Sequence, residues 1–177
     1  MAQCDTGVQS LKPADKMEIV DVPFTERAGL ERILEESFEG WYLRHSKGTL
    51  RSVEIVRVAV LSGAPVGLVM LKTLEADIGY VFYIAVDKAH RRMGVARSLL
   101  SDSLQRFKAA DVEEVFAGIE VDNEASEGLF MGEGFVQTSF AEVSRKHGSL
   151  RALNMYRLMR IVPGEILLCK SIARGLV

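Results

Sequence analysis

Two spacings of apolar residues along the chain predict its secondary structure. Alternating or continuous apolar runs are typical of strands, and apolar residues three or four positions apart are typical of helices. Strands are therefore predicted at 17–22, 53–61, 66–74, 78–86, 115–121 and 135–143. Helices are predicted at 25–38 with Thr25 as N-cap, at 94–109 and at 124–131, with a shorter helix or loop at 40–50. After a polar loop at 144–149, one or two further apolar segments follow at 155–168.

The order of these elements indicates how the strands pair. Short turns at 62–65 and 75–77 separate three consecutive strands, which we expect to form an antiparallel meander. The strands at 78–86 and 115–121 are joined through a helix, and such a crossover requires parallel pairing. A sheet with both kinds of pairing is mixed, so the expected fold class is α/β, with helices flanking a mixed α+β sheet.

Length and composition fit one globular domain of ordinary size. The chain has 177 residues, of which 48% are hydrophobic and 26% charged, enough for a single sizeable core. We expect an N-terminal arm over Met1 to Lys16 and one domain over Met17 to Val177. No apolar run is long enough to span a membrane, and the start lacks the pattern of a secretory signal. The expected location is therefore the cytoplasm, with no membrane partner.

Charge, cysteine and histidine content narrow the classes of function. The net charge is −2 at pH 7, so no global positive field favours nucleic acid as a partner. Cys4 and Cys169 lie near opposite ends and form neither a zinc-binding spacing nor a redox pair. We expect two free thiols, which can be bridged only if the termini meet. His45, His90 and His147 are scattered, so no metal site is predicted.

Positive charge gathers locally between the long apolar strand and the helix that follows it. Arg91 and Arg92 stand in this loop, Gly94 and Ala96 lie at the start of the helix, and Arg97 follows. The first amides of a helix are unpaired, and its dipole favours an anion there. Gly94 lets a phosphate approach the backbone closely, and the arginines add charge-assisted bonds. A polyanionic small molecule fits this loop; a solvated helix start that binds nothing is the alternative.

Two motifs resemble those of the GNAT superfamily of N-acetyltransferases. The first is an apolar strand end and a basic loop, Tyr83-Ile84-Ala85-Val86-Asp87 and then Arg91-Arg92-Met93-Gly94-Val95-Ala96. It is similar to the acetyl-CoA motif of that family, in which Arg or Gln is followed by two residues, Gly, one residue, and Gly or Ala. The second motif follows at the expected distance and consists of Asn123, Ser126, Leu129, Phe130, Gly134 and Phe135. The resemblance covers 17–143 in element order and is strongest over 80–135.

The resemblance implies a GNAT-type fold in which the parallel fourth and fifth strands of a mostly antiparallel sheet splay apart to admit acetyl-CoA. It also implies that the strand backbone pairs with the pantetheine arm and that the loop amides hold the pyrophosphate. The implied cofactor-binding residues are Ile84, Ala85, Val86, Arg91, Arg92, Met93, Gly94, Val95, Ala96, Arg97, Asn123 and Phe130. Acetyl-CoA is then the acetyl donor, and the reaction uses no metal.

Acetyl transfer to an amine requires a base for the ammonium proton and a proton for the departing thiolate. Glu120 and Tyr80, on the two strands expected to splay, are the candidate bases. A surface carboxylate and a packed ring are the alternative interpretations. Strand alternation puts Glu120 and Ile119 on opposite faces and leaves open which one faces the cleft. Phe130 stands where the family often has a tyrosine proton donor, so the proton comes from water or another residue, or the reaction is slow.

The motifs do not specify the amine acceptor. Trp41, Tyr42 and His45 fall on the segment that usually covers the acceptor site in the family, although the first two can equally cap the core. The expected partners are acetyl-CoA and a primary amine on a protein N-terminus, a lysine or a small molecule. A binding module that holds acyl-CoA with weak or no turnover is the competing hypothesis, supported by Phe130. The resemblance also allows a homodimer.

Overall fold

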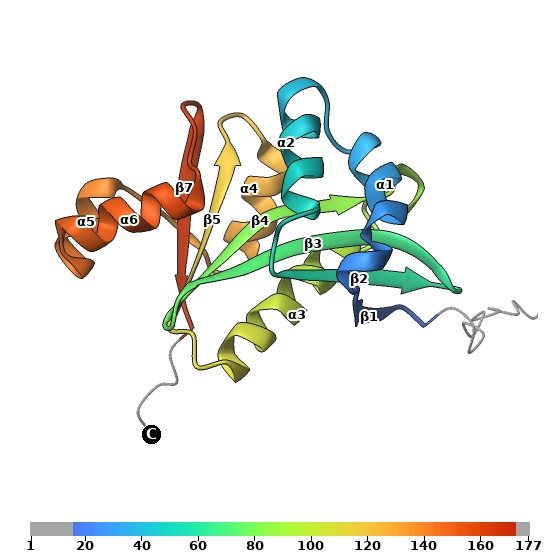
Figure 1. Ribbon diagram of the computed structural model, residues 1–177, viewed down its shortest axis with the longest axis horizontal. Coiled ribbons are helices and arrows are strands. Elements are labelled where there is room, and N and C mark those ends of the chain that lie inside the picture. The colour runs from blue at the N-terminus through green and yellow to red at the C-terminus, as the bar shows by residue number, and fades with distance from the viewer. Residues whose placement is uncertain (1–15, 173–177) are drawn as a thin grey trace, which may run out of the picture.

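A seven-stranded sheet forms the centre of the computed structural model, which describes residues 16–172 (Figure 1). The strand order is β1-β2-β3-β4-β5-β7-β6. The strands are β1 (Glu18–Asp21), β2 (Ile55–Leu61), β3 (Ala64–Glu75), β4 (Ile78–Val86), β5 (Glu114–Glu120), β6 (Val136–Thr138) and β7 (Glu165–Ser171). β1 to β4 pair antiparallel in sequence order, β4 and β5 pair parallel, and β7 lies antiparallel between β5 and β6. The predicted mixed α/β class is confirmed.

Helices cover both faces of this sheet (Figure 1). They are η2 (Phe24–Leu30), α1 (Glu31–Glu35), α2 (Gly40–Leu50), η3 (Lys88–His90), α3 (Val95–Ala109), α4 (Glu124–Gly132), α5 (Phe140–His147) and α6 (Ser149–Met159). α3 and α4 pack on one face, where Leu99, Phe107 and Phe130 join strand residues in one apolar cluster. α1 and α2 pack on the other face above β2 to β4, and α5 and α6 pack beside them on β5 and β7. Phe82 contacts both of these last two clusters.

β4 and β5 diverge after a short paired stretch. Their parallel register ends at Val81 opposite Ala117. β4 then continues to Val86 and β5 to Glu120, and the two strands separate as Figure 1 shows. The expected splay of the fourth and fifth strands is confirmed. This separation of the two backbones beyond Val81 and Ala117, called the gap below, lies at the carboxyl ends of adjacent parallel strands, a common place for ligands in α/β proteins.

The structure differs from the prediction after α4. The strand predicted at 135–143 is only three residues long, as β6, and α5 begins at Phe140. Ser139 Oγ accepts a hydrogen bond from the amide of Glu142, and Glu142 Oε2 accepts one from the amide of Ser139. This capping box stabilises a helix in residues whose apolar pattern indicates a strand. The loop predicted at 144–149 belongs instead to the end of α5, to Gly148 and to the start of α6.

The helix predicted at 25–38 is divided into the 3-10 helix η2 and the short α1. Pro23, not the expected Thr25, occupies the N-cap position of η2. From η2 the buried side chain of Arg27 donates hydrogen bonds to the carbonyl oxygens of Leu50 at 3.2 Å and Val53 at 2.6 Å. This guanidinium therefore fixes η2 against the end of α2, a long-range contact that helical periodicity does not reveal.

Part of the predicted organisation falls outside the described residues. The N-terminal arm expected at Met1 to Lys16 does so as far as residue 15, and Cys4 with it. Cys169 is a free thiol whose Sγ donates to Oε1 of Glu114 at 3.5 Å. Burial raises the pKa of Cys169 to about 12, and the Glu114 carboxylate adds to this effect. The thiol is therefore protonated at neutral pH and is a poor nucleophile.

Candidate active site

The N-terminus of α3 has no side-chain cap. Gly94 occupies the N-cap position, and no side chain bonds to the first turn of this 15-residue helix. The amide of Ser98 donates to the carbonyl of Gly94 at 3.0 Å, so the amides at 95–97 precede the first intrahelical bond and have no acceptor within the helix. By contrast, Asn123 and Ser139 cap α4 and α5 with their side chains. The unpaired amides and the helix dipole make this end of α3 suitable for an anion.

The backbone before α3 turns through two residues with positive φ, Arg92 at 65° and Gly94 at 83°. An ideal Cβ on Gly94 would meet no atom within 4 Å, so a phosphate has room to approach the backbone there. Val95 packs instead toward β3, where a Cβ on Gly67 would lie 2.9 Å from the Val95 side chain. Gly67 pairs with Val86, the last residue of β4. This close packing sets the start of α3 beside the open end of β4.

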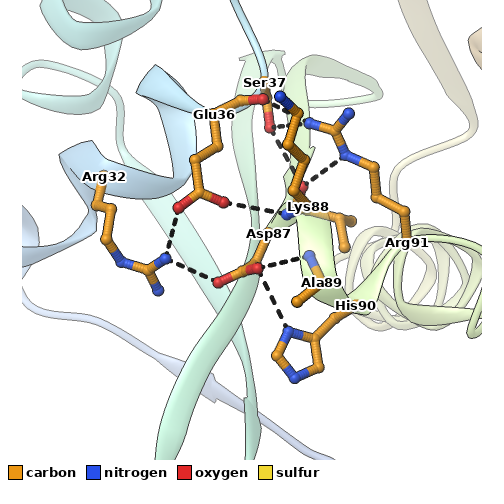
Figure 2. Close-up of polar contacts among 9 residues, drawn as sticks. Arg32, Glu36, Ser37, Asp87, Lys88, Ala89, His90 and Arg91 are labelled. Atoms are coloured by element: carbon orange, nitrogen blue, oxygen red, sulfur yellow. Dashed lines mark hydrogen bonds and ion pairs between the residues drawn. The ribbon is translucent and has the colours of Figure 1, made fainter.

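Arg91 ties the loop before α3 to two other segments (Figure 2). Its Nε donates to the carbonyl oxygen of Val86 at 3.1 Å, and its Nη2 donates to that of Glu36 at 2.6 Å. Ser37 Oγ also donates to the Val86 carbonyl, at 3.3 Å. The guanidinium predicted to face the pyrophosphate thus already binds two backbone carbonyl groups of the protein. Arg91 positions the loop, whatever further contact it makes with a ligand.

Asp87 fixes the same loop from its other side (Figure 2). Its carboxylate accepts from Nη1 of Arg32 at 2.8 Å and from the amide of Ala89 at 2.9 Å. Glu36 accepts from the same Arg32 nitrogen at 2.7 Å and from the amide of Lys88 at 3.0 Å. The Arg32 guanidinium, followed by the Ala89 amide, lowers the pKa of Asp87, which is therefore ionised at neutral pH. Charged groups of α1 and its C-cap therefore hold this loop in place.

Two further arginines are available to an anion at this end of α3. Arg92 is exposed and forms no ion pair within residues 16–172. The Arg97 side chain is 68% exposed, and its Nε lies 3.6 Å from Oε1 of Glu133. A pair at that distance and exposure is weak, because solvent screens it. Both side chains keep N–H groups that can bind phosphate oxygens, and their contact with a pyrophosphate stays a prediction.

The open edge of β4 directs backbone groups into the gap between β4 and β5. The amide of Asp87 donates to the carbonyl of Val66 on β3 at 2.9 Å. Because successive residues of a strand direct their backbone groups to alternate sides, those of Val86 and Ile84 point away from β3. Ala85 directs its backbone to β3, and its methyl group is buried under α1 and α2. The Val86 carbonyl already accepts from Arg91 and Ser37, so an extended ligand can pair like an added strand with the backbone of Ile84 and with the amide of Val86.

Tyr80 lies near the end of the paired stretch of β4 and β5, next to the point where the two strands separate. It is 3% exposed, and its hydroxyl accepts a hydrogen bond from the amide of Gly118 at 3.2 Å. An ideal Cβ on Gly118 would lie 2.8 Å from that hydroxyl and 3.3 Å from Oε2 of Glu165, so the contact depends on glycine. Burial strongly raises the pKa of Tyr80, and the nearby Glu165 raises it further. Tyr80 is therefore protonated at neutral pH, where it can donate a hydrogen bond but cannot accept a proton from an ammonium group.

Glu120 and Ile119, at the end of β5, point to opposite faces of the sheet. Ile119 is buried in the apolar cluster under α3 and α4. Glu120 is exposed and lines a cavity of about 380 Å³ beside α2. The other residues lining this acidic cavity are Trp41, Tyr42, Val162, Pro163 and Gly164. The carboxylate therefore lies at the end of β5 beside Trp41 and Tyr42. Of the two residues whose orientation the sequence left open, Glu120 faces the cavity and Ile119 faces the core.

A second carboxylate, which the sequence analysis did not single out, lies next to Glu120. Glu165 begins β7 opposite Glu120 in the antiparallel register, so both side chains stand on one face. Its Oε2 accepts from the amide of Val162 at 3.1 Å, and the Tyr42 hydroxyl donates to Oε1 at 3.5 Å. Burial raises the pKa of Glu165, and the charge of Glu120 raises it further. Only the pairing of β7 with β5 brings these carboxylates together, and no local pattern in the sequence signals it.

An aromatic stack joins α2 to β4. Trp41 stacks on His45 with ring centroids 4.8 Å apart and an interplanar angle of 11°. Nδ1 of His45 lies 2.7 Å from the hydroxyl of Tyr83 on β4. Burial lowers the pKa of His45, and Arg160 lowers it further, so the ring is neutral at pH 7. Trp41 and Tyr42 line the acidic cavity. From the sequence they are candidates to line the acceptor site, and that role stays a prediction.

Asn123 and Phe130 both contribute to the fold of α4. Asn123 Oδ1 accepts from the amide of Ser126 at 3.1 Å and so caps the helix. Phe130 is buried and packs edge-on against Phe135, with ring centroids 5.0 Å apart. Because phenylalanine carries no hydroxyl, this position supplies no proton to a departing thiolate. The contact of both residues with pantetheine stays a prediction.

Acidic, histidine and cysteine side chains form no cluster that could hold a metal ion in the part of the chain that the structure describes. Over residues 16–172, none of the helices combines the length and apolar character needed to cross a membrane.

Sequence comparisons agree with this geometry. Residues 18–135, more than half of the chain, match the acetyltransferase (GNAT) family. Over 59 residues the chain is 29% identical to N-alpha-acetyltransferase 30 of Saccharomyces cerevisiae. That match covers 33% of this chain and 34% of the yeast protein, so the chain spans about a third of the length of this curated relative.

Solved structures share the fold over almost the whole chain. The ribosomal-protein-S18-alanine N-acetyltransferase from Escherichia coli has a TM-score of 0.68 at 15% identity, covering 90% of this chain and 96% of that one. A GNAT family acetyltransferase from Elizabethkingia anophelis with acetyl-CoA bound has a TM-score of 0.65 at 17% identity, covering 91% and 100%. At these identities the likeness shows the fold alone. With the family match over 18–135, the uncapped start of α3 and the splayed strands, the chain belongs to the GNAT family of acetyltransferases.

Proposed function

We propose that the protein transfers the acetyl group of acetyl-CoA to a primary amine. The proposal is carried by one observation: a candidate site follows the end of each splayed strand, the start of α3 after β4 and the cavity with Glu120 at the end of β5. The uncapped start of α3 belongs to one face of the sheet, and the cavity with Glu120 belongs to the other. A phosphate-bearing donor and an amine acceptor would therefore enter from opposite faces and meet in the gap.

The residues at the donor side fit acetyl-CoA. The amides at 95–97 and the side chains of Arg92 and Arg97 offer donors to a pyrophosphate. The backbone of Ile84 and the amide of Val86 lie along an open strand edge and would pair with an extended pantetheine arm. The relative from Elizabethkingia anophelis, whose structure contains acetyl-CoA, supports this choice of donor.

The chain supplies a candidate base for the amine, but Phe130 has no hydroxyl that could protonate the departing thiolate. When bound, acetyl-CoA supplies a thioester whose C–S bond breaks as the new C–N bond forms. Glu120, the exposed carboxylate of the acidic cavity, would take the ammonium proton so that the neutral amine can attack. Tyr80, protonated next to the point where β4 and β5 separate, would donate a hydrogen bond there. Water would return a proton to the thiolate, which has a reference thiol pKa of about 8.5.

The names of two relatives bear on the acceptor. The yeast relative is an N-alpha-acetyltransferase, and the Escherichia coli structure is an N-acetyltransferase of a ribosomal-protein alanine. We therefore place the α-amine of a protein or peptide first among the acceptors, ahead of lysine side chains and small amines.

The test is thiol release from acetyl-CoA in the presence of peptides with a free N-terminus, the same peptides with a blocked N-terminus, and small amines. Release that depends on the free amine, with an acetylated product seen by mass spectrometry, is the expected result. Phe130 favours one other function, a module that binds acyl-CoA without turnover. Binding of coenzyme A without release by any amine would support that module and refute the enzyme.

A further inference from the structure

A second cavity adjoins the acidic cavity and shares Trp41 with it. This basic cavity has a volume of about 300 Å³ and is lined by Trp41, Arg44, His45, Gly48, Thr49 and Arg160. Its two charged groups, Arg44 and Arg160, are both cations, and no carboxylate lines it. Glu120 is the charged residue that lines the acidic cavity. Trp41 therefore lies between two cavities of opposite charge, one lined by the Glu120 carboxylate and the other by the guanidinium groups of Arg44 and Arg160.

The protein does not neutralise the two arginines of the basic cavity. Several other arginines are paired with carboxylates, as Arg57 is with Asp102 at 2.8 Å. Neither Arg44 nor Arg160 forms an ion pair or a side-chain hydrogen bond within residues 16–172. Each guanidinium therefore keeps all of its N–H groups for a ligand. Planar guanidinium groups match carboxylates well, because they can bind both oxygens at once.

Arg160 holds its charge close to the aromatic stack of α2. It ends α6 with φ +56° and ψ +38°, a left-handed conformation that glycine or asparagine adopts more readily. Its positive charge adds to burial in lowering the pKa of His45, and it opposes the effect of burial on Tyr83. Arg160 therefore brings a positive charge to the cavity that His45 also lines, from a backbone position where an arginine is unusual.

We propose that the acceptor carries a carboxylate as well as its amine, with the amine at Glu120 and the carboxylate at Arg44 and Arg160. This inference rests on the proposed function, whose acceptor class it narrows. A simple amine uses only the acidic cavity. An amino acid, or a peptide with an acidic side chain near its N-terminus, spans Trp41 and meets an opposite charge at each end.

Matched acceptors test the proposal and separate these two sources of the carboxylate. One arm compares γ-aminobutyrate with butylamine, and the other compares peptides that carry Glu or Gln at the second or third position. The expected result is that kcat/KM is roughly tenfold higher for the carboxylate member of at least one pair, as for a partly exposed charge-assisted contact. The preference should weaken as salt is raised. Equal kcat/KM within every pair would overturn the proposal.

Variants locate the preference in the basic cavity. Arg44→Gln removes one charge, and Arg160→Gly removes the other while suiting the left-handed backbone. Each should raise KM for the carboxylate acceptor roughly tenfold and leave kcat, and all constants of the uncharged acceptor, unchanged. Arg157→Gln is the matched control, because Arg157 lies on α6 but does not line the cavity. Equal effects on both acceptors, or effects as large in the control, would overturn the assignment.

Failure of the proposed function can be distinguished from failure of this inference. If no amine releases thiol, the transferase proposal is wrong, and the same Glu and Gln peptides are then titrated calorimetrically into the protein with coenzyme A present. Tighter binding of the Glu peptide, lost in Arg44→Gln, would still support the carboxylate site. Equal binding of the two peptides would overturn it.

Discussion

Replacing Gly94 with glutamate is expected to abolish the stabilisation of the protein by coenzyme A. Gly94 is the N-cap of α3, and an ideal Cβ there would meet no protein atom within 4 Å. A glutamate side chain would extend into the space over the unpaired amides, and its carboxylate would compete with phosphate for them. Gly94→Ala is the matched control, because it adds a Cβ to the same backbone without adding charge.

The magnitudes follow from the backbone conformation and from ligand linkage. Gly94 has φ +83°, so either substitution should lower the free energy of unfolding by about 1 kcal/mol in the absence of ligand. Coenzyme A at about 100 times its Kd raises that free energy by about 2.7 kcal/mol. In a chain of 177 residues this corresponds to a rise in Tm of roughly 5–10 °C.

Thermal melting of the three proteins, with and without coenzyme A, measures this rise. The wild type and Gly94→Ala should show it, and Gly94→Glu should not. A rise of equal size in all three proteins would refute the placement of the pyrophosphate at the start of α3. A rise missing from both variants would show that the conformation at Gly94, rather than charge, controls binding.

Three further predictions concern the gap and the acceptor side. Glu120→Gln should lower kcat for amine acetylation about 100-fold or more without changing the melting shift with coenzyme A, and an unchanged kcat would exclude Glu120 as the base. Gly118→Ala, with its Cβ 2.8 Å from the Tyr80 hydroxyl, should lower the free energy of unfolding in urea by about 1–3 kcal/mol. Its control is Gly128→Ala in α4, where a Cβ would have nothing within 4 Å; this variant should leave that free energy unchanged or raise it by up to about 1 kcal/mol. Folding raises the pKa of Glu165, so the wild type should lose stability as pH rises from about 4.5 through that raised pKa. Glu165→Gln lacks this titration, so its free energy of unfolding, measured in urea at each pH, should fall less than that of the wild type over the same range.

Elements with long, regular apolar patterns could be predicted from the sequence. The bounds of β4 and α2 agree with the predicted 78–86 and 40–50, and α3 begins at Val95, directly after the predicted Gly94. Continuous apolar residues mark a buried strand, and the glycine before a periodic segment marks the helix start. The donor side of the site is built from these neighbouring residues, so the pattern that predicts the fold also predicts the anion site.

The acceptor side could not be predicted in the same way. Ser139 and Glu142 stand at the spacing of a capping box, which is a sequence signal for the start of α5. The apolar residues that follow Phe135 favour a strand over the same segment. Glu165 gives no such signal. Its place beside Glu120 depends on β7 entering the sheet between β5 and β6, a pairing between segments far apart in the sequence.

The donor and acceptor sides are nevertheless connected through one short segment. Arg91 binds the carbonyl of Glu36, and Ser37 binds the carbonyl of Val86, so the end of α1 is fixed to the loop that precedes α3 (Figure 2). α2 begins directly afterwards at Gly40 and carries Trp41 to both cavities. The contacts that position the loop before α3 therefore also help to position Trp41 at the two cavities. A substitution at Arg91 should accordingly disturb acceptor recognition as well as coenzyme A binding, whereas one at Arg44 should affect the acceptor alone.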